Sequence, residues 1–195
     1  MNKINRETWL NKATDIMRKG LFKRSHLEIP KDVKISCGFA PSGNRANKYQ
    51  TLGVCHNRKS SEAGVNEIFI SPVTSDSMRV LDILAHELIH AIDDCKNGHG
   101  KPFRDMAVAI GLEGQMRSTV AGEKLKVELK KIIDEIGEYP HDTVNLSRTV
   151  KKQSTRMLKV SCSCCEFSYR TSKKNIQMMT NLICNSCGGV SLEIN

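Results

Sequence analysis

The most informative stretch of the sequence is HELIHAIDDCKNGHGKPF, residues 86–103. His86 and His90 are four residues apart, so on a helix they lie one turn apart on the same face and can bind one cation. Glu87 is turned about 100° around the helix axis, where it can reach a metal-bound water. His99 follows in a Gly-His-Gly turn that can bring its ring back to the other two. The spacing predicts a catalytic zinc with three protein ligands and an open fourth position.

In this interpretation zinc lowers the pKa of a bound water toward about 7. Glu87 accepts the proton as hydroxide attacks a peptide carbonyl, and returns it to the leaving nitrogen. Two other interpretations stand beside it: ordinary histidines on a helix and loop with a solvated Glu87, or a metal site without hydrolytic activity. Asp82, one turn before His86, is either a solvated carboxylate or a group that orients a ligand ring. An extended substrate is expected beside NEIFISP, residues 66–72, if that strand is an edge.

The segments around this motif alternate between helical and strand patterns. SDSMRVLDILAHELIHAIDDC, residues 75–95, has a broad apolar face and predicts a largely buried helix capped by Ser75 or Asp76. Two-residue alternation or a short apolar run predicts three strands. The other predicted helices span residues 6–22, 102–111 and 123–137, and the strands span 33–37, 51–56 and 66–72. The sequence therefore predicts an α+β protein.

The eight cysteines predict a second metal site. The first twenty residues contain no apolar run of signal-peptide length, so we expect a protein of the cytoplasm whose reduced thiols bind metal. Cys162, Cys165, Cys184 and Cys187 follow the pattern C-x2-C, eighteen residues, C-x2-C, which is typical of a four-thiolate structural zinc ribbon. Cys164 is an alternative to Cys165. The competing interpretation is a set of reduced cysteines without metal.

Positive charge is concentrated in the last quarter of the chain. Of a net charge of +9, residues 148–195 contribute eight Lys or Arg against two Glu. This predicts an anionic partner, with DNA first, although a solvated basic face would look the same. Phe167 and Tyr169 either stack on unpaired bases or pack at the rim of a small core. The expected nucleic-acid contacts are Lys151, Lys152, Arg156, Lys159, Arg170, Lys173 and Lys174.

Four stretches also carry a family resemblance. LAHELIHAIDDCKNGHGKPF, EIFISP, GLEGQMRSTVAGE and TRMLKVSCSCC resemble stretches of SprT-like zinc metalloproteases, in particular microbial and phage members. The eukaryotic relative Spartan cleaves proteins that are crosslinked to DNA. The resemblance implies that His86, His90 and His99 bind zinc, that Glu87 is the catalytic acid–base, and that Cys165 is the second ribbon ligand.

Together these observations predict an SprT-like metalloprotease domain, residues 1–147, and a four-cysteine zinc-ribbon subdomain, residues 148–195. The first is expected to have a zincin-like core, with a small antiparallel or mixed sheet beside the HExxH helix. The expected function is zinc-dependent cleavage of DNA-associated or DNA-crosslinked proteins, using one catalytic and one structural zinc and no membrane. The location would be the nucleoid, or the host cytoplasm for a viral protein. The alternatives are hydrolysis of a non-peptide substrate and a non-catalytic, transcription-linked accessory factor that binds nucleic acid.

Overall fold

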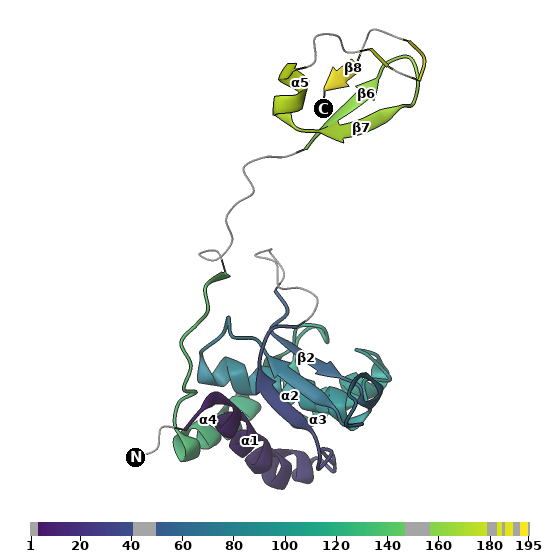
Figure 1. The fold of residues 1–195 in the computed structure, drawn as a ribbon. Helices are drawn as coiled ribbons and strands as arrows, with labels where there is room; N and C mark the ends of the chain where they lie inside the picture. The colour runs from purple at the N-terminus through teal and green to yellow at the C-terminus, as the bar shows by residue number, and fades with distance from the viewer. Residues whose placement is uncertain are drawn as a thin grey trace. The chain divides into compact units, whose positions relative to one another are not determined.

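The chain divides into two compact units, Met1–Ser147 and Arg148–Asn195. The computed structural model, shown in Figure 1, describes residues 4–40, 50–146, 157–178, 183–184, 186–188 and 192–194. That each unit folds as an independent domain stays a prediction.

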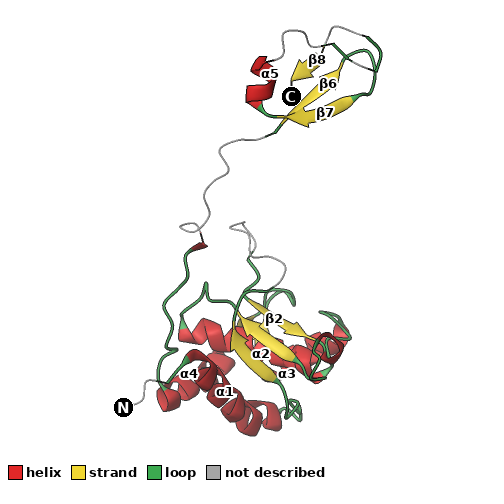
Figure 2. Ribbon diagram, in the orientation of Figure 1, coloured by secondary structure: helices red, strands yellow, loops and turns green. Residues whose placement is uncertain are grey.

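The first unit combines helices with short strands, which confirms the predicted α+β class (Figure 2). Its helices are α1 (Arg6–Met17), α2 (Ser77–Ile92), α3 (Lys101–Ile110) and α4 (Glu123–Ile136), with a π-helical turn η1 (Arg18–Phe22) and a 3-10 turn η2 (Arg58–Ser60). Its strands are β1 (Lys34–Cys37), β2 (Gly53–His56), β3 (Glu67–Ile70), β4 (Leu112–Glu113) and β5 (Val120–Ala121). None of the helices in the described ranges has the length and apolar character needed to cross a membrane.

A three-stranded mixed sheet lies in the order β1-β3-β2. Strand β3 pairs in parallel with β1, where Lys34 is opposite Glu67, and antiparallel with β2, where Gly53 is opposite Ile70. An extended substrate was expected beside residues 66–72 only if that strand is an edge, and this condition is not met, because β3 is the central strand of the sheet. Side-chain alternation within one strand does not reveal which distant segments pair with it. Among the described strands, β2 is the edge strand that the cavity described below adjoins.

Helix α2 passes through the centre of the unit. The Asp76 side chain accepts a hydrogen bond from the Arg79 main-chain N–H, which confirms one of the two predicted caps. The helix contacts β2 and β3 as well as α1, α3 and α4. Most of its apolar side chains are buried, Leu84 and Leu88 completely, and full burial of such a side chain contributes about 1.5–3 kcal/mol. The core therefore fixes the rotation of the helix that carries the HExxH residues.

Helix α3 and the end of α4 close the first unit. Helix α3 ends at Gly111, whose left-handed φ of 91° and close approach to Leu125 favour glycine. Helix α4 ends at Gly137, as predicted, and the carbonyl oxygen of this residue accepts a hydrogen bond from Trp9 Nε1 at 2.9 Å. The N-terminal helix is thereby fixed to the last helix of the unit.

The second unit is built around a three-stranded antiparallel sheet in the order β7-β6-β8. Its strands are β6 (Leu158–Cys162), β7 (Ser168–Thr171) and β8 (Leu192–Ile194), and a short helix α5 (Lys173–Met178) follows β7. The β-rich character agrees with the sequence, whereas the helix was not expected.

Candidate active site and metal centres

The three histidines of the motif converge. His86 and His90 lie on α2, and the Nε2 atom of His99 is 3.2 Å from the Nε2 atom of each. All three ligand atoms lie within 4.8 Å of one another. Two nitrogens bound to a tetrahedral zinc at about 2.0–2.1 Å lie about 3.3 Å apart. The donor set and its spacing therefore fit a zinc ion.

The charge states of these rings suit a metal. Burial, with the neighbouring histidines, lowers the pKa of His86 to about 3. Burial, with His99, lowers the pKa of His90 to about 4, and burial with Arg117 lowers the pKa of His99. At neutral pH His86 and His90 are therefore uncharged, which is the form in which imidazole binds zinc.

Phe103, from α3, supports all three rings. Its ring centroid lies 4.8 Å from that of His86, 4.4 Å from that of His90 and 5.0 Å from that of His99, and its side chain is fully buried. The stretch that ends in KPF thus supplies both a candidate ligand, His99, and the ring against which the candidate ligands pack. Sequence analysis did not assign this role, because an apolar residue after a proline is equally typical of any helix start.

Thr119 is the partner of the first ligand ring. Its buried hydroxyl lies 2.8 Å from Nδ1 of His86. Asp82 is buried and pairs with Arg79, and burial raises the pKa of its carboxyl against the effect of that arginine. Both expectations for Asp82, a solvated carboxylate and a group orienting a ligand ring, are therefore wrong. The residue that contacts the ring comes from a loop over thirty positions further along the chain, which helix periodicity does not reveal.

Glu87 is buried against the edge strand. Burial, with Cys95 nearby, raises the pKa of its carboxyl to about 8, while a hydrogen bond to the backbone of Cys55 acts in the opposite direction. A Cβ atom at Gly53 would lie 2.6 Å from Glu87 Oε1 and 2.5 Å from a methyl carbon of Ile83. The interpretation with a solvated Glu87 is therefore wrong. Sequence analysis did not single out Gly53, although a glycine within a strand pattern often marks such a close approach.

A cavity of about 440 Å³ joins these groups. The three histidines and Glu87 share it with segment 50–55, which includes the first three residues of β2, and with residues 117–119. The thiols of Cys55 and Cys95 also line it, and Cys95 Sγ donates to the carbonyl oxygen of Cys55 at 3.4 Å. The cavity therefore places the candidate metal ligands and a buried carboxyl beside the backbone of an edge strand.

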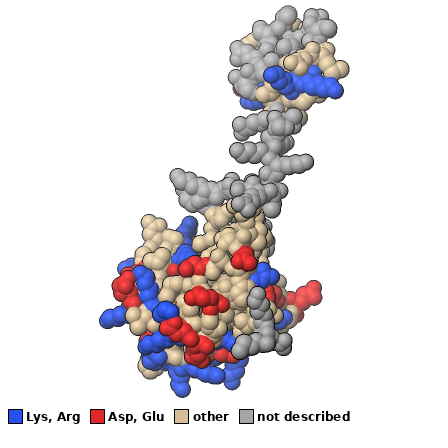
Figure 3. Space-filling view, turned by 90° about the vertical axis from the view of Figure 1, so that its left-hand side faces the viewer, with Lys and Arg blue, Asp and Glu red and all other residues tan. Residues whose placement is uncertain are grey.

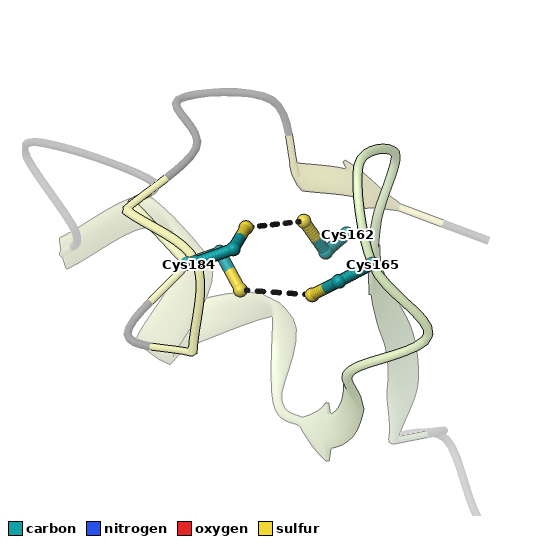
Figure 4. A group of neighbouring side chains, drawn as sticks. Cys162, Cys165 and Cys184 are labelled. Atoms are coloured by element: carbon teal, nitrogen blue, oxygen red, sulfur yellow. Dashed lines mark hydrogen bonds between the residues drawn. The ribbon is translucent and has the colours of Figure 1, made fainter.

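The four cysteines of the second unit form another group. Their sulfur atoms lie within 4.8 Å of one another, with Cys162 and Cys187 at 3.6 Å and Cys165 and Cys184 at 3.6 Å (Figure 4). Four thiolates about 2.3 Å from a tetrahedral zinc lie about 3.8 Å apart, whereas a disulfide requires about 2.05 Å. The spacing thus fits a zinc ion and not a disulfide.

Cys164 lies beside this group but is not part of it. Its sulfur is 3.4 Å from that of Cys162 and 3.6 Å from that of Cys187. A hydrogen bond from the backbone of Cys164 lowers the pKa of Cys162 to about 6, which favours the thiolate. The grouping agrees with Cys165 as the second ligand, and that role stays a prediction.

Basic side chains are exposed on the second unit. Lys159 and Arg170 are opposite each other on β6 and β7, and Lys173 and Lys174 begin α5. In Figure 3 blue atoms gather on the visible side of this unit, while both signs of charge are interspersed on the first. Phe167 is exposed. The other expected contacts, Lys151, Lys152 and Arg156, lie outside the described residues.

The fold and the site define the class of this protein: an α+β protein whose central helix presents two histidines to a third, in a group able to hold a metal. The model of the SprT-like family matches residues 21–123, more than half of the chain, and the protein belongs to this family. The match contains β1 to β5 with α2, α3 and the histidine turn, and it ends before the cysteine unit. Comparison with curated proteins and with solved structures gave no match.

Proposed function

We propose that the protein is a zinc-dependent endopeptidase. The observation that carries this proposal is the convergence of three imidazole nitrogens in one cavity with the buried carboxyl of Glu87. Membership of the SprT-like family supports it. A zinc ion held by His86, His90 and His99 would supply a Lewis acid and lower the pKa of a water molecule.

Glu87 is the residue that moves the proton. The charge of a zinc ion nearby would favour the ionised carboxylate against the pKa-raising effect of burial. In that form the carboxylate accepts a proton from the attacking water and passes it to the nitrogen that leaves. Burial limits exchange of that proton with bulk solvent, so the same proton is available for the second transfer. The absence of a side chain at Gly53 leaves room for the carboxyl against β2.

The substrate is proposed to lie extended along β2. This strand pairs with β3 on one side, and segment 50–55 lines the cavity. An extended peptide that pairs with the other side of β2 would gain main-chain hydrogen bonds with little dependence on its sequence. Such binding suits an enzyme that acts on many proteins rather than on one.

Glu87→Gln tests the chemistry. We expect cleavage of an unstructured protein substrate to fall by about 10²–10⁴-fold, because the amide cannot accept the proton. Zinc content and circular dichroism should match the wild type, since Gln has nearly the same shape. Glu135→Gln, an exposed glutamate of α4, is the matched control and should cleave normally. Undiminished cleavage by the Glu87 variant would reject the proposed mechanism, and no cleavage by the wild type would favour a non-catalytic accessory protein.

DNA is the partner proposed for the second unit, so that the substrates would be DNA-associated or DNA-crosslinked proteins. The exposed basic pair on β6 and β7 and the exposed Phe167 support this proposal. Changing both Lys159 and Arg170 to Glu should weaken binding of single-stranded DNA and reduce the slope of log K against log salt by about 0.7 per lost phosphate contact. Lys12 and Lys124, exposed on the first unit, provide a control of equal charge change. Equal effects of the two double variants would exclude a specific role for the ribbon.

A further inference from the structure

We propose that Thr119 is a positioning residue that fixes the ring orientation of His86 for metal binding. This inference rests on the three-histidine metal site of the proposed function. The Thr119 hydroxyl lies 2.8 Å from Nδ1 of His86, while Nε2 of the same ring lies 3.2 Å from Nε2 of His99. One ring nitrogen thus faces the metal position, and the other faces an oxygen.

Metal binding at Nε2 sets the tautomer of His86, and the contact with Thr119 suits that tautomer. Its Nε2 must carry a lone pair to bind a metal, so the proton of the neutral ring resides on Nδ1. The hydroxyl oxygen of Thr119 then accepts that Nδ1–H, so the hydrogen bond and the metal position together hold the ring in one orientation. Metal-binding histidines in general donate their second N–H to such a partner. Thr119 is only 3% exposed, so water does not readily replace it.

The loop that carries Thr119 is fastened to the helix that carries His86. Arg79 Nη1 donates to the main-chain carbonyl oxygen of Thr119 at 3.2 Å, and the same guanidinium pairs with Asp82. Arg79, Asp82 and His86 follow one another at spacings of three and four, so they share one face of α2. The hydroxyl is therefore held over the same helix face that presents the ligand.

The partner is a neutral hydroxyl rather than a carboxylate. A carboxylate at this place would make the imidazole more basic and transfer more electron density to the metal. The carboxylate of Asp82 is close in sequence, but it is paired with Arg79. Thr119 thus fixes the geometry of the ring while leaving the metal a strong Lewis acid.

Zinc affinity and cobalt spectra test this proposal without an activity assay. Thr119→Val should weaken zinc binding at the three-histidine site by about 10- to 100-fold in chelator competition, whereas Thr119→Ser should restore most of the affinity. Cobalt(II) distinguishes this site from the four-thiolate site by its absorption. Thr14→Val is the matched control: its buried hydroxyl donates to the Leu10 carbonyl oxygen in α1, away from the site, so it should leave zinc affinity unchanged. Wild-type affinity in Thr119→Val would overturn the proposal.

A measurement on the wild-type protein covers the case in which Thr119→Val does not fold. Nitrogen-15 NMR of the zinc-loaded full chain should show that Nδ1 of His86 carries a hydrogen-bonded proton and that Nε2 binds the metal. Metal bound through Nδ1 would overturn the inference. If the wild-type protein binds zinc in this way but cleaves no peptide, the proposed function is rejected, whereas the role of Thr119 is retained.

Discussion

Gly53 is the residue at which β2 comes closest to Glu87. A side chain there would overlap Glu87 Oε1 at 2.6 Å and Ile83 at 2.5 Å, so either the carboxyl or the strand must shift. Both sides of the contact matter, because the proposed proton transfer needs the carboxyl in place and the proposed substrate pairs with the strand.

Gly53→Ala should therefore impair both catalysis and stability. We expect cleavage to fall by about 10²-fold, as for a misplacement of about 1 Å, with unfolding free energy lowered by about 1–3 kcal/mol. Gly20→Ala is the control, because the nearest atom to its Cβ would be the end of the Arg24 side chain at 3.5 Å. Urea denaturation and single-substrate kinetics measure the two effects. Full activity in Gly53→Ala would mean that β2 need not lie against Glu87.

At the residue scale, the sequence predicts the arrangement of the candidate site residues on α2 better than it predicts the residues that position them. The spacing of His86, Glu87 and His90 specifies their arrangement because one helix holds all three. Gly53 and Thr119 reach the site through sheet pairing and a loop, so their roles depend on contacts between distant segments. The local sequence pattern does not predict those contacts.

Among the elements, α3 contributes to the site through one aromatic ring. Phe103 contacts the ring of each candidate ligand, including His99, which lies in the turn between α2 and α3. That turn leaves α2 through Asp94 and Cys95, both with left-handed φ values near 55–59°. The third ligand is therefore positioned jointly by the turn and by the packing of α3.

Phe103→Leu separates packing from metal binding. The loss of unfolding free energy should be about 1 kcal/mol, since the volume is largely conserved. Zinc affinity should fall as well, because the histidine rings lose the surface that orients them. Phe22→Leu, at another fully buried phenylalanine, should cost similar stability without a change in zinc affinity. Equal zinc affinity in both variants would show that α3 supports only the fold.

The elements themselves were predicted to different degrees. The cap at Asp76 and the apolar face identify α2, and glycines mark the ends of α3 and α4. The order of the strands was not predicted. Strand β1 pairs with β3 in parallel and β2 pairs with it antiparallel, and neither pairing can be inferred from the pattern within a single strand. Helix α5 was missed because its six residues are too few to show a period.

Across the whole molecule the two units differ in how much apolar core supports them. In the first unit a continuous cluster extends from Trp9 to Tyr139. Among the described residues of the second, the buried side chains are Val160, Thr171 and the cysteines 162 and 184. A core this small needs a further constraint, which four thiolates around a zinc ion would supply.

Metal content should therefore divide between the units. We expect two zinc ions per intact chain and one in a chain that ends at Ser147, measured by mass spectrometry of the metal. A strong chelator should abolish hydrogen-exchange protection in β6 and β7 while α2 remains protected, because only the second unit depends on metal for its fold. A shortened chain that retains two ions, or none, contradicts this division.

The thiols of Cys55 and Cys95 have a consequence for inhibitor experiments. Both belong to the wall of the cavity that contains Glu87 and the three histidines. An alkylating reagent that adds a bulky group to either sulfur would occupy the space proposed for the peptide. It would stop turnover although neither thiol is a catalytic nucleophile in the proposed mechanism. Iodoacetamide sensitivity would then imitate a cysteine protease, and mercurial compounds would imitate loss of the metal. Diagnosis of the reaction class by reagent profile alone would therefore give the wrong class for the proposed activity.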